Sequence, residues 1–112
     1  MKHSVHIFGH KWTIKEQTTK SNSLLNDYAG YCDWTTRTIV IRKDFDGNLE
    51  DMQRYMNKVT RHEITHAFLY EAGLNECSCA TDAWALNEEM VEWIANIGPD
   101  LFAAWQEVGV ED

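Results

Sequence analysis

Apolar and polar residues alternate in short runs along the first part of the chain. Over residues 3–17 the alternation is interrupted at Gly9, which predicts two short strands around a turn. Residues 30–34 and 36–42 are rich in aromatic and β-branched side chains, which predicts two further strand segments. Residues 18–27 are polar apart from two adjacent leucines, which could lie on a helical turn.

The second part of the chain has the three- and four-residue spacing of amphipathic helices. Apolar residues recur at these steps over residues 49–70, which predicts one long helix. Asn48 is the predicted N-cap, with Glu50 and Asp51 in the first turn, where the helix dipole favours negative charge. Gly73 is predicted to end this helix in a left-handed conformation.

Two more helices are predicted towards the C-terminus. The first covers residues 81–97, has Thr81 or Asp82 as its N-cap, and is ended by the Gly-Pro pair at 98–99. The second covers about residues 100–108 and is expected to pack over the back of the domain. Strands followed by helices predict an α+β fold with a short mixed or antiparallel sheet.

Length and charge narrow the classes of protein that fit this pattern. A chain of 112 residues has room for one core, so residues 1–112 are expected to form a single domain. Residues 1–61 hold all ten Lys and Arg with seven Asp and Glu, whereas residues 62–112 hold eleven Asp and Glu and neither Lys nor Arg. The acidic half has no basic patch for a phosphate backbone, so we expect no nucleic-acid partner.

The sequence also indicates a compartment. Residues 1–11 contain no apolar signal-peptide region, and no apolar run is long enough to span a bilayer, so no membrane partner is expected. The three cysteines, Cys32, Cys77 and Cys79, are an odd number and include a Cys-x-Cys pair that is poorly spaced for a disulfide. We therefore expect reduced thiols and a cytoplasmic protein.

The predicted long helix contains the sequence His62-Glu63-Ile64-Thr65-His66, an H-E-x-x-H pattern. A spacing of four residues on a helix puts both imidazoles on one face, one turn apart, where a single zinc ion can accept both. Glu63 then lies beside the metal without being a ligand and can take a proton from zinc-bound water. The pattern therefore predicts a zinc site with an adjacent general base.

A catalytic zinc site needs one more protein ligand. Glu88 and Glu92 lie one turn apart on the same side of the next predicted helix, so Glu88 can complete the set and Glu92 can accept the N–H of a liganding histidine. Glu89, about 100° further round the helix, is a rival for the third ligand. A thiolate from Cys77 or Cys79 is another alternative.

The H-E-x-x-H at 62–66 and the N-E-x-x-x-E at 87–92 together resemble the motifs of the gluzincins, the thermolysin-like zinc metallopeptidases. The family pattern ends in Asp where this chain has Glu92, which lengthens that side chain by one methylene. In size and order of elements, the chain is similar to the short minigluzincin-like peptidases and to small proteins of this kind in phages and prophages. A looser similarity links it to the ImmA/IrrE-type peptidases.

The resemblance implies a zincin-like fold, with an active-site helix followed by a second helix that bears the third ligand. It implies that His62, His66 and Glu88 bind one zinc ion. It further implies that Glu63 is the general base and acid, and that Glu92 orients a histidine. The strand just before the long helix would lie beside the metal, where a free edge could pair with an extended peptide.

The expected function is hydrolysis of a peptide bond in a specific cytoplasmic protein, because so small a domain has little material for a deep cleft. Two alternatives stay open: a zinc-binding interaction or structural module without turnover, and a metal hydrolase acting on a non-peptide amide. Tyr55, Tyr70 and His10 are unranked candidates for stabilising the oxyanion. The sequence does not predict the oligomeric state.

Overall fold

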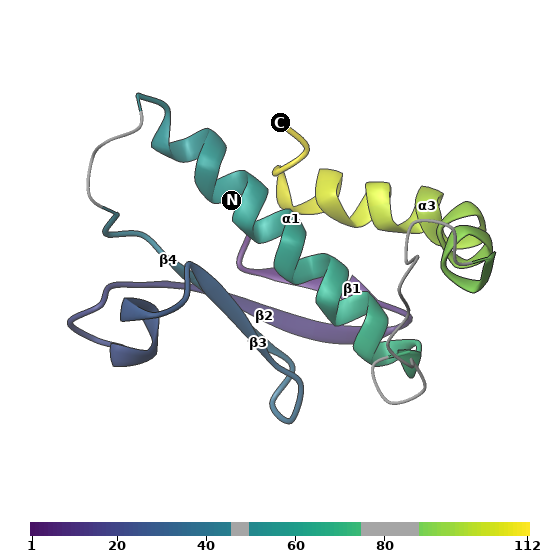
Figure 1. The fold of residues 1–112 in the computed structure, drawn as a ribbon, viewed down its shortest axis with the longest axis horizontal. Coiled ribbons are helices and arrows are strands. Elements are labelled where there is room, and N and C mark those ends of the chain that lie inside the picture. Colours follow the sequence, from purple (N-terminus) through teal and green to yellow (C-terminus); the bar gives the residue numbers. More distant parts are fainter. Residues whose placement is uncertain (46–49, 75–87) are drawn as a thin grey trace.

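A four-stranded sheet carries two long helices on one face (Figure 1). The computed structural model describes residues 1–45, 50–74 and 88–112. The strand order is β1-β2-β4-β3, with β1–β2 and β3–β4 antiparallel and β2–β4 parallel. The fold is therefore α+β with a mixed sheet, as the pattern of strands followed by helices predicts. Within the described ranges, no helix combines the length and the apolar character needed to cross a membrane.

The N-terminal hairpin consists of β1 (Ser4–Ile7) and β2 (His10–Gln17). Ile7 pairs with His10 across a two-residue turn, in which Phe8 and Gly9 have φ values of 50° and 82°. This left-handed turn suits glycine and matches the twist of the flanking strands. The predicted hairpin is confirmed.

The second hairpin consists of β3 (Gly30–Asp33) and β4 (Thr38–Arg42), and a 3-10 helix, η1 (Ser23–Asn26), precedes it. These elements confirm the two predicted strand segments and the helical turn. The prediction that the strand before the long helix has a free edge is wrong, because β4 lies between β2 and β3. Its three central residues, Ile39 to Ile41, are all buried, and Ile39 and Ile41 belong to the core between the sheet and the helices.

Helix α1 (Met52–Glu71) contains the H-E-x-x-H sequence. Its N-cap is Asp51, whose side chain accepts a hydrogen bond from the Arg54 N–H at 2.9 Å, so the predicted place of Asp51 in the first turn is wrong. The predicted N-cap, Asn48, lies outside the described residues. Gly73 has a φ of 76° and its N–H donates to the Tyr70 carbonyl, which confirms the left-handed termination.

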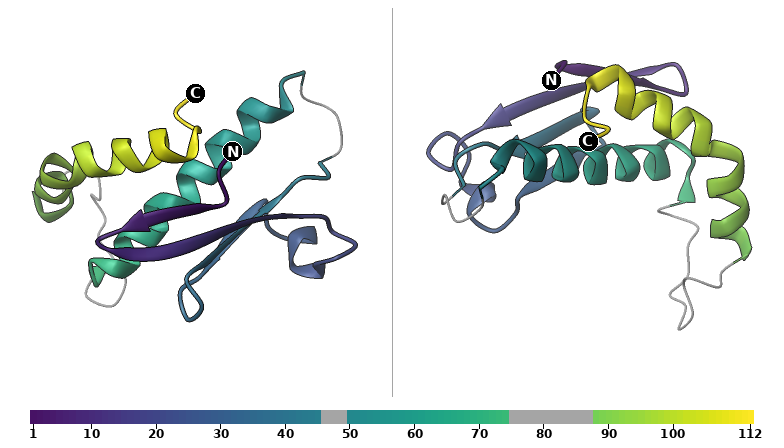
Figure 2. Two further views of the ribbon diagram at one scale, coloured as in Figure 1. Left: turned by 180° about the vertical axis from the view of Figure 1, so that it is seen from behind. Right: turned by 90° about the horizontal axis from the view of Figure 1, so that it is seen from above.

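Helix α3 (Glu88–Val108) runs through Gly98 and Pro99, so the predicted break at these residues is wrong. Proline has no N–H to donate within a helix, and its ring clashes with the preceding turn, which bends helices rather than always ending them. Figure 2 shows the helix changing direction between its green and yellow halves. The start of the predicted helix, residues 81–87, lies outside the described residues.

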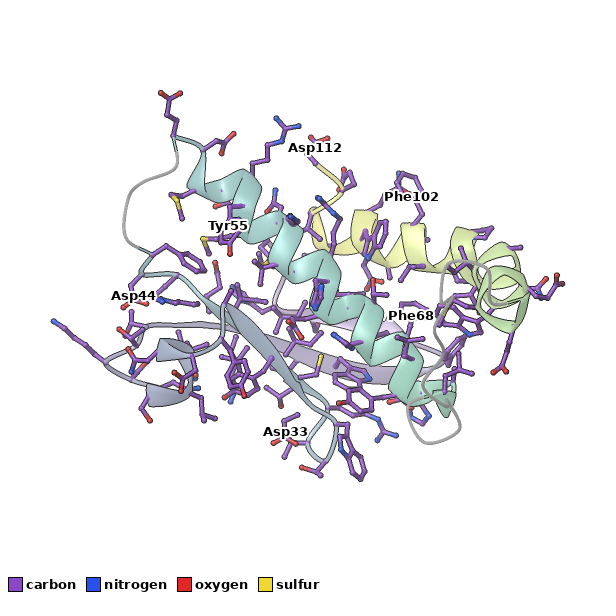
Figure 3. The ribbon with its side chains drawn as sticks, viewed as in Figure 1. Asp33, Asp44, Tyr55, Phe68, Phe102 and Asp112 are labelled. Atoms are coloured by element: carbon purple, nitrogen blue, oxygen red, sulfur yellow. The ribbon has the colours of Figure 1, made fainter. Side chains whose placement is uncertain are left out.

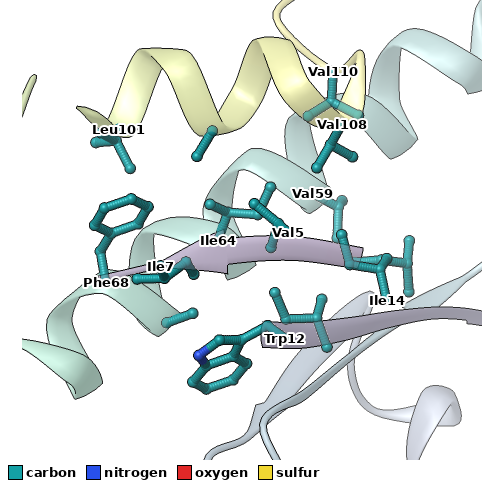
Figure 4. Packing of buried hydrophobic residues seen from close by; sticks show 14 of the residues in the cluster. Val5, Ile7, Trp12, Ile14, Val59, Ile64, Phe68, Leu101, Val108 and Val110 are labelled. Atoms are coloured by element: carbon teal, nitrogen blue, oxygen red, sulfur yellow. The ribbon is translucent and has the colours of Figure 1, made fainter. Parts of the chain in front are cut away.

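One cluster of buried side chains joins the sheet to both helices (Figure 4). Alternate residues of the strands point to this face because side chains on a strand alternate between its two sides. The fully buried members include Val5, Ile7, Trp12, Ile14, Ile39, Ile41, Ile64 and Val108. This packing fixes which face of α1 is turned towards the sheet and therefore positions the motif on it.

Candidate metal centre

The motif lies on α1 at the boundary between the core and the surface. Ile64, Ala67 and Phe68 of the same helix segment are buried against the sheet. His62 is exposed and His66 is half-buried, whereas the Glu63 side chain is only 6% exposed. The periodicity of the helix thus places both imidazoles at the surface and turns the carboxylate between them towards the sheet.

The two imidazoles converge. The Nε2 atoms of His62 and His66 lie 3.1 Å apart, with ring centroids 4.8 Å apart and planes inclined by 71°. Two nitrogens bonded to one tetrahedral zinc ion at about 2.0–2.1 Å are separated by about 3.3 Å. The spacing of these two donors therefore fits two positions in the coordination shell of zinc.

Glu63 lies where α1 meets strand β3. Burial raises the pKa of the Glu63 carboxyl, while the neighbouring charges of His62 and His66 partly offset that rise. The Cys32 thiol of β3 donates to the backbone carbonyl of Glu63 at 3.0 Å and lies 3.6 Å from its Oε1 atom. Burial, followed by the charge of Glu63, raises the pKa of Cys32, so this thiol stays protonated and can donate.

Strand β3 can approach α1 closely because it begins with glycine. A Cβ atom on Gly30 would lie 3.0 Å from the Val40 carbonyl oxygen, 3.0 Å from Val59 Cγ1 and 3.1 Å from Ile41 Cδ1. Since β3 pairs with β4 on one side only, its other edge is free within the described sheet. The strand edge beside the motif is therefore that of β3, and not that of β4 as predicted.

A cavity of about 260 Å³ opens next to Glu63. Its walls come from α1 and from the start of β3. Tyr55, on the N-terminal half of α1, is the lining residue labelled in Figure 3. The residues that line it are Ala29, Gly30, Tyr55, Lys58, Val59, His62 and Glu63. A group bound in this cavity would contact one predicted zinc ligand and the predicted general base.

Glu88, the predicted third ligand, is the first residue of α3, at the green end of that helix in Figure 2, and its side chain is not among those that the structure describes. Glu89 and Glu92 are exposed, and the Glu92 carboxylate accepts a hydrogen bond from Asn96 Nδ2 at 3.3 Å, one turn along the same helix.

The described residues therefore do not complete a three-ligand site. Among them, no group of three or more His, Cys, Asp and Glu side chains is arranged to hold a metal ion. The alternative ligands Cys77 and Cys79 lie outside the described residues. The structure brings together His62, Glu63 and His66, and adds Cys32.

The three candidates for stabilising the oxyanion occupy different surroundings. Tyr55 lines the cavity that His62 and Glu63 also line. The Tyr70 ring stacks on the exposed Trp34 ring, with centroids 6.4 Å apart and planes inclined by 28°. His10 Nε2 lies 3.7 Å from a carboxylate oxygen of Glu71. Tyr55 is thus the candidate that lines the same cavity as the predicted general base.

Comparison with known proteins found no match among family models, curated proteins or solved structures. The resemblance to the gluzincins therefore depends on the residues of the two motifs themselves.

Proposed function

We propose that this protein is a zinc-dependent metallopeptidase in which His62 and His66 bind the metal and Glu63 is the general base. The observation that carries the proposal is the convergence of the two Nε2 atoms at 3.1 Å on one face of α1. Without metal, one imidazole can donate to the other at this distance, and a zinc ion bound by both would replace that hydrogen bond with little change in the spacing of the two nitrogens. The buried carboxylate of Glu63, about 100° round the helix from His62, is the second group that such an enzyme requires.

Zinc and Glu63 have distinct roles in the proposed reaction. Zinc supplies a Lewis acid, which lowers the pKa of water to about 7 and polarises a carbonyl oxygen. Glu63 accepts the proton of the attacking water and then delivers it to the leaving amine. Burial raises the pKa of Glu63, and this suits a carboxylate that must both accept and release a proton near neutral pH.

Glu88 is the proposed third ligand, and Glu92 the residue that orients a liganding histidine. This part of the proposal is carried by the N-E-x-x-x-E spacing, which puts the two carboxylates one turn apart on the same side of a helix. It requires the first turn of α3 to lie beside His62 and His66 when zinc is bound.

The free edge of β3 suits a peptide substrate. Extended peptides bind exposed strand edges through main-chain hydrogen bonds. Since Cys32 of β3 contacts Glu63, a peptide paired with β3 would pass the general base. The proposed substrate is therefore a segment of a cytoplasmic protein that can adopt an extended conformation.

Zinc content tests the ligand set. The protein is purified without a histidine tag and dialysed against zinc, and its metal is measured by elemental mass spectrometry. We expect about one zinc ion per chain in the wild type, little in His66→Ala and Glu88→Ala, and full retention in Glu89→Ala. Zinc loss from Glu89→Ala instead of Glu88→Ala would transfer the third-ligand assignment to Glu89.

A folded wild-type protein that binds no zinc would contradict the proposed function. Bound zinc without hydrolysis of any peptide in a complex peptide mixture would favour a zinc-binding interaction module instead. Hydrolysis of small amides but not of peptides would favour a different metal hydrolase.

A further inference from the structure

The cavity beside Glu63 contains a cation that peptide hydrolysis does not need. Lys58 lies one helical turn before His62 and lines this cavity of about 260 Å³. It is the only lysine or arginine among the described residues that line it. The ion pairs between described side chains do not include Lys58, so its charge is not neutralised by a neighbouring carboxylate there.

The neighbouring cations of α1 are placed differently. Arg61 Nη1 donates to the Val110 carbonyl at 2.8 Å, which ties that side chain to the C-terminal segment. Arg54 lines a neighbouring surface pocket, which Tyr55 and Lys58 also line, but it does not line the cavity beside Glu63. Among the basic residues of α1, Lys58 is therefore the one that lines the cavity.

The other residues that line the cavity suit the methylene groups of a bound side chain. Val59, Ala29 and Gly30 provide an apolar surface. The Tyr55 ring is held edge-on against Phe45, with centroids 5.1 Å apart, so this wall is fixed by packing. Methylene groups can lie against these residues while a charged end reaches Lys58.

Two of the side chains that line the cavity carry charges of opposite sign. Glu63 lies at one side and repels a carboxylate, whereas Lys58 attracts one. Lys58 is exposed, so an apolar side chain in the same place would make no use of its charge, whereas a carboxylate would form an ion pair with it. An acidic side chain with its carboxylate at Lys58 is thus the occupant whose charge matches the wall.

We propose that this cavity binds an acidic side chain of the substrate, and that Lys58 determines this specificity. The inference rests on the proposed function, because the bound residue would adjoin the peptide bond held at His62, Glu63 and His66. The substrate class is an extended peptide segment with Glu or Asp next to the bond that is cleaved.

Binding is measured first, with zinc-supplemented Glu63→Gln protein so that the peptides are not consumed. The probes are two pools of acetylated and amidated octapeptides that carry a central Glu or a central Gln, with uncharged residues elsewhere. Binding is followed by the amide resonance of Gly30 in NMR titrations. We expect the Glu pool to bind about fivefold more tightly than the Gln pool, the size of one partly solvated ion pair.

Two charge reversals identify the residue responsible. Lys58→Glu should abolish the preference for the Glu pool, and should favour a third pool with a central Lys. Lys15→Glu, at an exposed position on β2, makes the same change in net charge but does not line the cavity, so it should keep the preference. Equal binding of the Glu and Gln pools, or a preference that survives in Lys58→Glu, would overturn the inference.

Cleavage of the same pools by the zinc-loaded wild type separates this inference from the proposed function. Cleavage without acidic preference would uphold the peptidase and overturn the role of Lys58. Preferential binding of the Glu pool without any cleavage would uphold the acidic site and contradict the peptidase. Cleavage next to the central Glu, lost in Lys58→Glu and kept in Lys15→Glu, would support both.

Discussion

The Glu63 side chain experiences two opposing effects on its ionisation. Burial against β3 raises the pKa of its carboxyl, and the charges of His62 and His66 act against that rise. Cys32 adds a donor at the backbone carbonyl of Glu63, which helps to fix where α1 meets β3. The carboxylate is therefore held in place by packing and remains next to both histidines.

Glu63→Gln should remove the proposed general base while keeping the shape of the side chain. We expect the rate of peptide hydrolysis to fall by about two to four orders of magnitude, because glutamine cannot accept the proton of the attacking water. Zinc content and the far-UV circular dichroism spectrum should be unchanged, since Glu63 is not a proposed ligand. A glutamine variant with normal kcat/KM would exclude Glu63 as the base.

Glu71 makes a second cluster of polar contacts, at the end of α1. It accepts hydrogen bonds from Trp12 Nε1 at 2.9 Å and from Arg37 Nε at 2.7 Å, and its side chain is 11% exposed. Burial alone would raise the pKa of Glu71, but the hydrogen bonds from Arg37 and Trp12 outweigh it and hold the pKa below its usual value. The folded state therefore favours the ionised form.

This lowered pKa predicts acid sensitivity. The stabilisation from ionised Glu71 is complete above the ordinary glutamate pKa of about 4.3, and is lost as the pH falls through the lower pKa of the folded state. Glu71→Gln should therefore lower the free energy of unfolding by about 1 kcal/mol at pH 7, with the difference disappearing in acid.

Urea unfolding at a series of pH values measures this difference. Glu111→Gln, at an exposed position, is the matched control and should change stability by less than about 0.5 kcal/mol at any pH. A gap between wild type and Glu71→Gln that stays constant down to low pH would show that the charge of Glu71 is not responsible.

At the scale of elements, the contact between β3 and α1 depends on Gly30. Gly30→Ala would place a methyl group 3.0 Å from the Val40 carbonyl oxygen and from Val59 Cγ1, both within well-packed elements. We expect the free energy of unfolding to fall by about 1–3 kcal/mol, the usual effect of overpacking.

Thermal or urea unfolding checks this, with Gly98→Ala as the matched control. A Cβ on Gly98 would meet no atom within 4 Å, and alanine is the better helix former, so that variant should gain up to about 1 kcal/mol. If Gly30→Ala were as stable as the wild type, the close approach of β3 to α1 would not be a constraint.

Local patterns predicted the elements better than their connections. The N-terminal hairpin and α1 follow from alternation and helical spacing, which are properties of neighbouring residues. The central place of β4 comes from its parallel pairing with β2, a contact between distant segments that periodicity does not encode. Helix α3 continues past Pro99 because Leu101 and Val108 beyond it pack into the shared core.

The residues of the candidate site also differ in how far the sequence alone predicts them. The convergence of His62 and His66 follows from their spacing on one helix, so the sequence was sufficient to predict it. Cys32 was not assigned to the site, because its position depends on how β3 docks against α1. Lys58 was not assigned either, although its spacing of four residues before His62 already places it on the same side of the helix. One signal was present for Cys32, since it shares with Gly30 the strand face that turns towards the helix.

At the scale of the whole molecule, α1 is tied to the C-terminal segment as well as to the sheet. Asn57 Nδ2 donates to the Asp112 carbonyl at 3.1 Å, and Arg61 donates to the Val110 carbonyl. Val108 and Val110 are themselves buried in the core. Any ligand that stabilises α1 therefore stabilises the packing of the whole chain.

Zinc binding should therefore raise the thermal stability of the whole fold. A ligand that binds only the folded state stabilises it by about 2.7 kcal/mol at a hundred times its Kd, which in a domain of this size corresponds to roughly 10 °C in Tm. We expect zinc to raise the Tm of the wild type by this amount and that of His66→Ala by far less. His3→Ala, which removes an exposed histidine outside the motif, should respond like the wild type.

Differential scanning calorimetry with and without zinc measures these shifts, and a chelator should reverse them. Magnesium, which prefers oxygen ligands and retains its water, should leave all three Tm values unchanged. Equal zinc-induced shifts in the wild type and His66→Ala would mean that the metal binds elsewhere, since the loss of one of two converging imidazoles must weaken a site that both of them form.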